Sequence, residues 1–418
     1  MQPLRGTKDI LPEESIIWQY LRDIVTPILS TCNYNEITTP IIENTELFYR
    51  TIGDDTDIIN KEMYNFFDQS QRKITLRPEG TASIARAFIS NKMYNHNSIN
   101  RLWYLGPMFR YERPQTGRQR QFHQLGIECI GSNNPIADVE VIRLAILILN
   151  TLDYKQYKLE INSIGKIEER EQYKSILINY LEKYIKDLDT DSQARIHTNP
   201  LRILDSKNSR TQEIIYDAPK LISCLNTESR KYFDNVCELL ESLSIPYSIN
   251  YNLIRGLDYY NDTAFEIKTK ELGSQDTICG GGRYNSLIEQ LGGPSTPSVG
   301  WAIGIERLII LIKNQLKLIN ICPYVYVINQ NLHTQKYTWK VINILETQKT
   351  KFELDLSCAN FSKQLKKAYN SGAKKCIIIG DNEVNQQNIT IKDLESNIQQ
   401  TIKLEVFIDQ IQYVLYSQ

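Results

Sequence analysis

The sequence lacks the features that mark several classes of protein. Its eight cysteines stand singly, without a C-x-x-C pair, and it has only four histidines, so we expect neither a disulfide framework nor a structural zinc site. No stretch approaches the ~18 consecutive apolar residues of a membrane span. The opening residues, Met1 to Lys8, contain no apolar signal core. We therefore expect a cytoplasmic protein without membrane association.

The glycine-rich loops that commonly bind phosphate are missing as well. Neither G-x-x-x-x-G-K-[ST] nor a G-x-G-x-x-G after a strand occurs, and the run GGGRY from Gly280 to Tyr284, which comes closest, has no lysine. If the protein binds ATP, arginine side chains must hold the nucleotide. Arginine suits this task because its guanidinium forms paired hydrogen bonds with phosphate and stacks on adenine.

Length and charge set further bounds. The 418 residues predict two or three domains, and the hydrophobic fraction of 41% fits an ordinary globular protein. A formal net charge of −1 indicates no general affinity for nucleic acid, so any RNA contact must come from local basic patches. Arg110, Arg113, Arg118 and Arg120 form one such patch.

The first three quarters of the chain combine strand and helix periods. A helix should begin at Pro12, with Pro27 kinking or shortening it near its end. Strands are expected at Asn35–Thr39, Met63–Phe67, Lys73–Leu76, Tyr157–Asn162, Tyr247–Leu253, Thr263–Lys268 and Thr277–Cys279, with a long hairpin over Arg101–Gly131. Further helices are expected at Glu79–Ile89 and Asp138–Leu152, and a strand followed by a helix over Val299–Ile319. Residues 166–243 show only helical periods, which predicts a helical insertion in a β-rich domain.

Pro323 marks a boundary. Beyond it, strands at Tyr324–Ile328, Phe352–Leu356 and Cys376–Ile379 alternate with helices at His333–Thr347 and Asn360–Ser371. This alternation predicts a small α/β layered domain. We therefore place the first domain at residues 1–321, with its insertion at about 166–243, and the second at residues 322–418.

The most informative segment is the hairpin, which carries an unusual set of polar residues. Alternate side chains of a strand share a face, so Arg110 and Glu112 should point together on the outgoing strand, and Phe122, Gln124 and Glu128 on the return strand. If these faces coincide, they form the floor of a site for a small, charged, partly aromatic ligand. A hairpin with a solvated polar face is the alternative.

Two more arginines stand at the ends of expected elements. Arg255 begins the run RGLDYY, and Arg307 ends GWAIGIER, where a surface pair with Glu306 is the alternative to a functional role. For the glycine triplet, a plain tight turn is as good an interpretation as a ligand wall. His123 has the opposite strand parity to the polar face, which predicts a structural histidine.

Together these segments resemble a known enzyme class. The polar hairpin resembles motif 2 of class II aminoacyl-tRNA synthetases, Gly300–Arg307 resembles motif 3, and the strand ending at Pro40 resembles motif 1. Neither class I signature, H-I-G-H or K-M-S-K-S, occurs. The histidyl-tRNA synthetase family is indicated by three runs, LRPEGT at Leu76–Thr81, RGLDYY at Arg255–Tyr260 and GGGRY at Gly280–Tyr284. The ordered set, which spans the chain from Arg5 onward, is far more specific than any one motif.

The resemblance implies both a fold and a reaction. The fold is an α+β catalytic domain with a mostly antiparallel sheet and a helical insertion, followed by a C-terminal α/β anticodon-binding domain. The reaction is the ATP-dependent attachment of L-histidine to tRNA(His) through a histidyl-adenylate, with release of AMP and pyrophosphate and with Mg²⁺ accompanying ATP. The family also implies a homodimer, with Asn35–Ile42 at the two-fold interface.

The resemblance further assigns roles to residues of this sequence. Histidine would be bound by Glu79, Gly80, Thr81, Arg110, Gln124, Glu128, Arg255, Tyr259 and Tyr260. ATP would be bound by Arg110, Glu112, Arg118, Phe122 and Arg307. The catalytic side chains would be Arg255, Arg110 and Arg307, and the tRNA acceptor end would meet Arg113 and Gln115. No residue is expected to bind a metal ion on its own account.

Two alternatives remain open. One is the regulatory subunit of an ATP phosphoribosyltransferase, a synthetase-like protein without aminoacylation activity, which usually lacks the anticodon domain and parts of the arginine set. The other is a sister enzyme such as prolyl- or threonyl-tRNA synthetase, which shares the class motifs but not the run from Arg255 to Tyr260.

Overall fold

The computed structural model of the protein describes residues 1–53, 56, 58–273, 276–313, 324–357 and 359–416. These residues form two compact units, one before and one after the stretch 314–323. Each unit has its own sheet and its own hydrophobic core. The predicted boundary between residues 321 and 322 lies outside the described residues.

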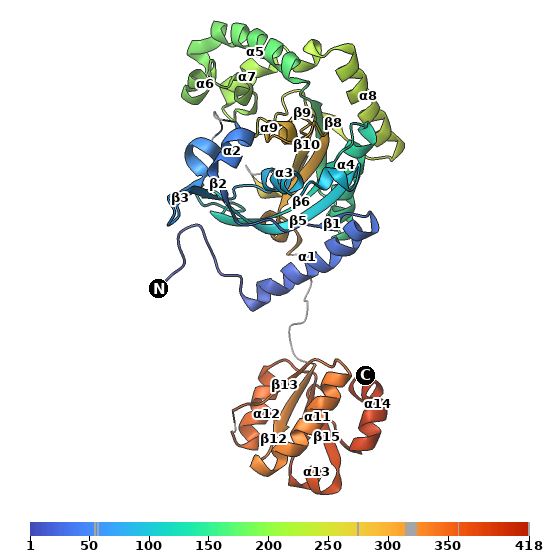
Figure 1. Cartoon of the computed structure of the whole chain (residues 1–418). Coiled ribbons are helices and arrows are strands. Elements are labelled where there is room, and N and C mark those ends of the chain that lie inside the picture. The colour runs from blue at the N-terminus through green and yellow to red at the C-terminus, as the bar shows by residue number, and fades with distance from the viewer. Residues whose placement is uncertain (54–55, 57, 274–275, 314–323, 358, 417–418) are drawn as a thin grey trace. The chain divides into compact units, whose positions relative to one another are not determined.

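The first unit is built on an eight-stranded sheet (Figure 1). Its strands are β1 (Asn35–Glu36), β5 (Asn100–Phe109), β6 (Gln121–Ile130), β7 (Lys158–Ser163), β8 (Ser248–Ile249), β9 (Asn261–Lys268), β10 (Thr277–Arg283) and β11 (Ser298–Gly304). Their order is β1-β5-β6-β11-β10-β9-β7-β8. The outermost pairs, β1 with β5 and β7 with β8, are parallel, and the pairs between them are antiparallel. The mostly antiparallel sheet predicted from the sequence is therefore confirmed.

Two hydrophobic clusters cover the two faces of this sheet, because successive side chains of a strand point to opposite sides. Trp103 and Ile127 belong to the cluster that also holds α1 (Pro12–Thr31), α4 (Pro135–Thr151) and α10 (Ile305–Ile312). Leu102 and Tyr104 belong to the cluster with α3 (Thr81–Ser90) and α9 (Leu287–Gln290). Helix α1 contains Pro27 and continues to Thr31, so the proline does not end it.

Smaller elements complete the first unit. A second sheet has the order β2-β4-β3, and its β3 and β4 form the predicted antiparallel hairpin. The bounds are β2 (Ile42–Asn44), β3 (Tyr64–Phe67), β4 (Lys73–Leu76), α2 (Thr45–Ile52), and the short helices η1 (Ile58–Glu62), η2 (Met93–Asn95) and η6 (Lys270–Leu272). Helix α2 begins where the side chain of Asn44 accepts the backbone N–H of Glu46, as an N-cap should.

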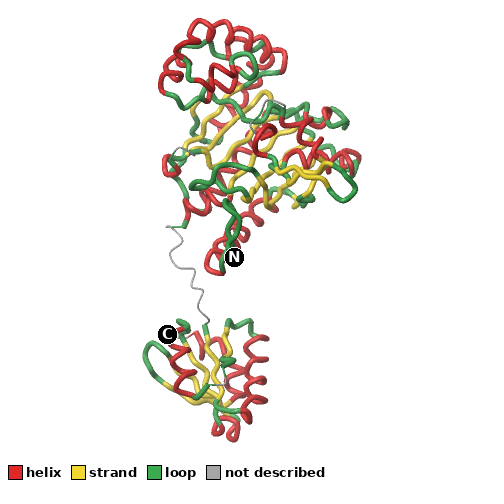
Figure 2. Tube along the Cα trace, turned by 90° about the vertical axis from the view of Figure 1, so that its left-hand side faces the viewer, coloured by secondary structure: helices red, strands yellow, loops and turns green. Residues whose placement is uncertain are grey.

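The chain between β7 and β8 is helical, as its periods predict. Its elements are α5 (Ile167–Leu181), η3 (Glu182–Asp187), α6 (Thr190–Arg195), η4 (Pro200–Asp205), α7 (Ser209–Tyr216), η5 (Leu221–Cys224) and α8 (Thr227–Ser242). Figure 2 shows most of these helices gathered beside the sheet, around a small core of their own that includes Tyr173 and Leu177. Helix α8 differs, because Phe233, Val236 and Leu240 pack into the main core of the sheet. It therefore connects the insertion to the eight-stranded sheet.

The second unit is a three-layer α/β domain. Its strands are β12 (Val325–Asn329), β13 (Phe352–Leu354), β14 (Lys375–Ile379), β15 (Asn388–Asp393) and β16 (Gln399–Lys403), in the order β13-β12-β14-β15-β16. Its helices are η7 (Leu332–Thr334), α11 (Gln335–Thr347), α12 (Phe361–Asn370), α13 (Asp381–Gln386) and α14 (Leu404–Tyr416). Helices α11 and α14 pack on one face of the sheet and α12 on the other. The α/β architecture is as expected, with two added antiparallel strands, β15 and β16, that the sequence analysis did not include.

Candidate active site

The polar residues of the hairpin line a cavity of about 180 Å³ in the first unit. Of the side chains expected to bind histidine or ATP, the following line it: Glu79, Thr81, Arg110, Glu112, Arg118, Phe122, Gln124, Arg255, Tyr259, Tyr260 and Arg307. They come from strands and loops that are far apart in the sequence and that the sheet brings together. The alternative of a solvated polar face does not describe this arrangement, because the face forms the floor of a cavity.

The arginine loop begins earlier than expected. Strand β5 ends at Phe109, so Arg110 and Glu112 lie in the loop just beyond it, where the N–H of Arg110 still donates to the carbonyl of Arg120 at 2.9 Å. Arg113 and Gln115, the expected contacts to tRNA, are exposed on this loop. The loop is therefore placed to present side chains both to the cavity and to solvent.

Among the described residues, Thr81 lines the cavity and Glu128 lies behind it. Its carboxylate is 1% exposed and accepts hydrogen bonds from the hydroxyl of Thr81, at 2.7 Å, and from the hydroxyl of Tyr284. Burial raises the pKa of Glu128 to about 8, against the lowering effect of these two hydrogen bonds. Gly300 faces Glu128 across the strand pair, and a Cβ there would lie 1.9 Å from the carboxylate oxygen Oε2. Only glycine leaves room for this carboxylate.

Glu79 organises the neighbouring wall. Its two carboxylate oxygens accept the backbone N–H groups of Thr81 and Ala82, both at 2.7 Å, at the start of α3. The side chain is 3% exposed, and burial raises its pKa while these hydrogen bonds lower it. The first turn of α3 and the carboxylate thus hold each other in place.

Two tyrosines of the site were missed by the sequence analysis. Tyr284 donates to Glu128, and Tyr104 lies between Gly80 and Gly126, where an added Cβ would fall 2.4 Å and 2.3 Å from its ring. Among the described residues, the Tyr104 hydroxyl has no hydrogen-bond partner. The signal that could have found Tyr104 is Gly126, a glycine between two polar residues on one strand face. Gly80, expected as a contact to histidine, makes room for the Tyr104 ring.

Arg255 lies between the two ends of the cavity. Its Nη1 pairs with Glu266, and its guanidinium carbon is 5.5 Å from the centre of the Tyr260 ring. A Cβ at Gly280 would lie 2.4 Å from Nη2, so this glycine gives the guanidinium its space. The glycine triplet is the middle of β10 and not a tight turn, and Gly280 lines the cavity. Among the described residues, Nε of Arg255 has no hydrogen-bond partner.

Three more guanidinium groups surround one carboxylate at the other end. Arg118 pairs with Glu112 at 2.9 Å, and Arg110 lies 4.0 Å from the same carboxylate. Arg110 also donates to the carbonyl of Pro78 at 2.9 Å, and its guanidinium lies 5.3 Å from the centre of the Phe122 ring. Burial, followed by repulsion from Arg118, lowers the pKa of Arg307. This concentration of positive charge suits an anionic ligand.

Arg307 is half-buried in the cavity wall and donates to the carbonyls of Gly117, at 3.1 Å, and Thr277, at 2.9 Å. Glu306 instead accepts the backbone N–H of His123 and contacts its ring nitrogen Nδ1 at 2.9 Å. The surface pair of Arg307 with Glu306 is therefore not what the structure contains. His123 also packs against Trp18, with ring centres 4.6 Å apart, which is the surrounding of a structural histidine.

The cavity thus combines two kinds of wall. One end has buried carboxylates and hydroxyls, which suit the ammonium and imidazole groups of an amino acid. The other end has arginines, which suit phosphates. Within the part of the chain that the structure describes, no group of three or more His, Cys, Asp or Glu side chains is placed to hold a metal ion. Nor does any described helix have the length and apolar character needed to cross a membrane.

Comparison with known proteins agrees with this geometry. Residues 6–308 match the histidyl-tRNA synthetase family model, and residues 324–413 match the anticodon-binding domain model. The histidine–tRNA ligase named chloroplastic from Gracilaria tenuistipitata var. liui is 61% identical over 98% of this chain and 98% of its own. The crystal structure of apo histidyl-tRNA synthetase from S. aureus is 37% identical, with a TM-score of 0.81 over 98% of this chain and 99% of its own.

A more distant structure bears on the regulatory-subunit alternative. The protein from Bacillus halodurans named as an ATP phosphoribosyltransferase regulatory subunit/histidyl-tRNA synthetase is 22% identical, with a TM-score of 0.67 over 91% of this chain and 98% of its own. At that identity the likeness shows the fold alone. The histidyl-tRNA synthetase model matches most of the first unit, the anticodon-binding domain model matches the second, and a histidine–tRNA ligase is 61% identical. The chain therefore belongs to the histidyl-tRNA synthetase family.

Proposed function

We propose that this protein is a histidine–tRNA ligase, which makes histidyl-adenylate from histidine and ATP and then transfers the histidyl group to tRNA(His). One observation carries the proposal beyond family membership. Thr81, which donates to the buried Glu128, and the arginines around Glu112 line the same cavity, so an amino acid and a triphosphate can meet there. The regulatory-subunit alternative fits this chain less well, because the arginine set is complete.

Histidine would lie at the closed end of the cavity. The carboxylate of Glu79, the hydroxyl of Thr81 and the amide of Gln124 would hold its α-ammonium group. In support, Oε1 of Gln124 has no hydrogen-bond partner among the described residues and lines the cavity. Glu128 would accept one imidazole N–H and Tyr260 would donate to the other ring nitrogen, with Tyr259 beside them. Such a site rejects amino acids that leave these buried groups unpaired.

ATP would lie at the arginine end. Phe122 and Arg307 would hold the adenine between them, and Glu112 would accept a hydrogen bond from its amino group. Arg118 would bind the γ-phosphate. In the structure Arg118 pairs with Glu112, so we expect ATP to replace this contact with a phosphate contact. Mg²⁺ would enter with ATP as part of the substrate and keep most of its water ligands.

The first step joins the two substrates. A carboxylate oxygen of histidine attacks the α-phosphorus in line, the new oxygen–phosphorus bond forms and pyrophosphate leaves. Arg110 and Arg255 would stabilise the negative charge that grows on the α-phosphate oxygens. The partnerless Nε of Arg255 is an unused donor of the kind this step requires.

The second step uses tRNA. A hydroxyl of the 3′-terminal ribose attacks the carbonyl carbon of the adenylate, and AMP leaves. Arg113 and Gln115 would contact the acceptor end, since both are exposed on the loop that borders the cavity. The second unit would read the anticodon, as the match to the anticodon-binding domain suggests. Removal of residues from Pro323 onward should then raise KM for tRNA and spare adenylate formation. A dimeric truncation that charges tRNA as well as the whole chain would exclude this role.

Two further proposals concern assembly and place. A homodimer through Asn35–Ile42 is supported by Ile41 and Ile42, which are 41% and 50% exposed and available to a partner subunit. Light scattering on the active protein would show the dimer or a monomer. For the compartment we propose the plastid in place of the cytoplasm, because the Gracilaria relative is named chloroplastic. Fractionation with a plastid marker would decide between the two.

The decisive experiment is ATP–pyrophosphate exchange, measured with each of the twenty amino acids in turn. We expect exchange with histidine and none comparable with the others. Exchange with proline or threonine would indicate a sister enzyme. No exchange with histidine would favour the regulatory subunit and overturn the proposal.

A further inference from the structure

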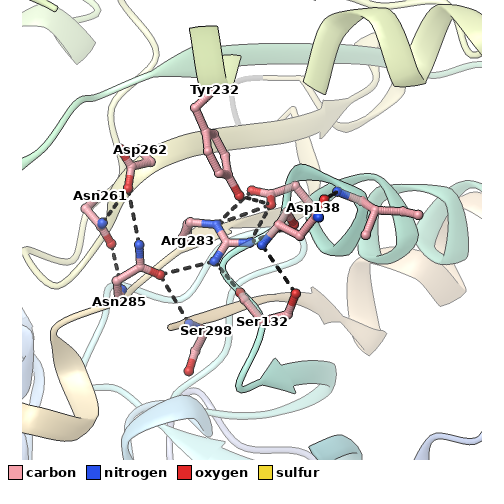
Figure 3. A network of polar contacts seen from close by, with 10 residues as sticks. Ser132, Asp138, Tyr232, Asn261, Asp262, Arg283, Asn285 and Ser298 are labelled. Atoms are coloured by element: carbon pink, nitrogen blue, oxygen red, sulfur yellow. Dashed lines mark hydrogen bonds and ion pairs between the residues drawn. The ribbon is translucent and has the colours of Figure 1, made fainter. Parts of the chain in front are cut away.

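A buried ion pair is the centre of the polar network drawn in Figure 3. The side chains of Arg283, at the end of β10, and Asp138, on α4, are both 0% exposed. Arg283 donates from Nη2 to Oδ2 of Asp138 at 2.5 Å and from Nε to both carboxylate oxygens at 3.2 Å. Its Nη1 also donates to the carbonyl of Ser132 at 2.7 Å and to the side-chain oxygen of Asn285 at 3.2 Å. All three guanidinium nitrogens of Arg283 thus donate hydrogen bonds.

This pair is a poor device for stability alone. Two charges taken out of water lose hydration that their mutual attraction only partly restores, and apolar replacements of such pairs are often neutral or stabilising. What a buried, multiply bonded pair does supply is a fixed geometry, because each hydrogen bond has a required direction. The ion pair therefore matters through the groups whose positions it fixes.

The polar contacts extend to the backbone beside Tyr260, which lines the cavity, and beside Tyr284, which donates to Glu128. Asn285 receives a contact from Arg283, accepts the N–H of Ser298 at 3.2 Å, and its own N–H donates to the side chain of Asn261 at 2.7 Å. Asn261 directly follows Tyr260, and Arg283 and Asn285 directly flank Tyr284. The register of β9 and β10 shifts between Gly282 and Arg283, so the pairing with β9 is irregular beside these contacts, while the pairing with β11 continues.

The two sides of this junction face different layers. Arg283 reaches α4 and α8, on one face of the sheet, while the ring of Tyr284 belongs to the hydrophobic cluster on the other face and its hydroxyl donates to Glu128. A shift of the arginine would therefore move the tyrosine, because they are neighbours on one short backbone segment. Misplacement of a site group by about 1 Å can cost ~10²-fold in rate.

Helix α8 is joined to the same network. The hydroxyl of Tyr232 donates to Oδ2 of Asp138 at 2.7 Å, and the ring lies 5.4 Å from the guanidinium carbon of Arg283. Since α8 is the last helix of the insertion and also packs into the main core, Tyr232 connects the insertion to the back of the histidine site.

We propose that Arg283, Asp138 and Tyr232 form a positioning cluster for histidine recognition, which holds Tyr284 against Glu128 and Tyr260 at the imidazole site and makes their placement depend on α8. The inference rests on the proposed function, since it assigns Glu128 and Tyr260 to the imidazole. None of the three cluster residues contacts the substrate. Their effect on the reaction passes through the backbone at Asn261 and Asn285 and through the hydroxyl of Tyr284.

The test is Tyr232→Phe, which removes one hydroxyl and keeps the ring. Its matched control is Tyr173→Phe, because the Tyr173 hydroxyl is also buried in the insertion but donates to the carbonyl of Pro219, at 2.9 Å, away from the site. In ATP–pyrophosphate exchange, Tyr232→Phe should raise KM for histidine by about 10-fold, the lower end of the ~10- to 100-fold range for residues that orient the ligands of a metal site. KM for ATP should not change, and Tyr173→Phe should change neither constant.

A second pair of variants separates position from folding. Arg283→Lys keeps the charge but loses the forked contacts, and Arg101→Lys does the same to the pair of Arg101 with Glu140 on the same helix α4. Arg283→Lys should raise KM for histidine more than Tyr232→Phe does, and Arg101→Lys should not. If Tyr232→Phe loses stability with KM for histidine unchanged, or if both Michaelis constants rise together, the cluster is structural and the proposal is overturned. Failure of the wild-type protein to exchange with histidine would instead overturn the proposed function.

Discussion

The two ends of the cavity differ in how their charged side chains are held. At the histidine end, Glu128 has two hydroxyl donors and Glu79 has two backbone N–H donors, and both carboxylates are buried. At the ATP end, Arg118 is paired with Glu112, and Nε of Arg118 has no hydrogen-bond partner among the described residues. The carboxylates of the histidine end are already hydrogen-bonded without a ligand, so we call this the prebuilt end. At the ATP end, a ligand must replace the contact between Arg118 and Glu112.

This difference predicts different kinetic behaviour at the two ends. A prebuilt end discriminates between amino acids, because a wrong side chain leaves buried polar groups unpaired. An arginine end stabilises charge that develops during reaction, because its donors strengthen their contacts as the phosphate oxygens become more negative. Substitutions at the first should change the use of histidine, and those at the second should change the rate of adenylate formation.

Glu128→Ala should have the largest effect. It removes the acceptor for the imidazole N–H and leaves Tyr284 and Thr81 without their partner, so kcat/KM for histidine should fall by ~10⁴ or more. Exchange kinetics at varied histidine give the value. Glu43→Ala is a matched control, because Glu43 is a buried carboxylate paired with Arg86 at 2.6 Å outside the cavity. An unchanged Michaelis constant and turnover for histidine would show that the prebuilt end does not read the imidazole.

Arg255→Ala should have a smaller effect, and of another kind. Loss of a donor that acts on transition-state charge typically lowers the rate by ~10²–10³, and histidine binding should change far less. Glu266 would not be stranded, because Lys268 lies 3.3 Å and the Thr277 hydroxyl 3.2 Å from its carboxylate. Exchange rates, together with histidine binding measured by calorimetry, separate the two quantities. Near-normal exchange would show that Arg255 takes no part in adenylate formation. The predicted kinetic difference between the two ends would then be lost.

Sequence patterns predicted the elements of the site better than its contacts. Strand parity correctly brought Phe122, Gln124 and Glu128 to one face, because the period of two leaves a β6 side chain only two directions. Parity could not reveal Tyr284, whose hydroxyl meets Glu128 from a residue 156 positions away. Contacts of that kind depend on which strands become neighbours, and the order β6-β11-β10 is set by the whole sheet.

Helical periods in the sequence also predicted the structure better than the glycines did. The long helix α4 lies within a few residues of the predicted helix Asp138–Leu152, and α8 lies inside the predicted helical stretch 166–243. The short helix α6 and the strands β15 and β16 carry too few apolar repeats to stand out. The glycine triplet left a tight turn and a ligand wall equally open, and the structure places it inside strand β10, where Gly280 gives space to the Arg255 guanidinium. No local rule separates these two uses of glycine.

The smallest expected effect is a pH dependence of the prebuilt end. Because burial raises the pKa of Glu128 to about 8, the free enzyme holds this carboxyl largely protonated at pH 7. The imidazole N–H is best accepted by the ionised form, so kcat/KM for histidine should rise by up to about tenfold per pH unit below 8 and then level off. Tyr284→Phe removes a hydrogen bond that lowers this pKa, so its profile should move to higher pH.

Comparing the two profiles cancels the titration of the substrate itself, because histidine is the same in both assays. Stability gives an independent check of the sign. A folded-state pKa raised above the ordinary value of 4.5 means that the folded protein binds more protons than the unfolded chain between 4.5 and about 8. The stabilising contribution of Glu128 is then complete below pH 4.5 and is lost as the pH rises toward 8. Glu128→Gln stays neutral, so in urea unfolding its advantage over the wild type should grow across this window. The contrary result would be parallel stability curves for the wild type and Glu128→Gln, together with superimposable activity profiles for the wild type and Tyr284→Phe. Glu128 would then be ionised throughout, and the histidine end, like the ATP end, would carry its charge before the ligand binds.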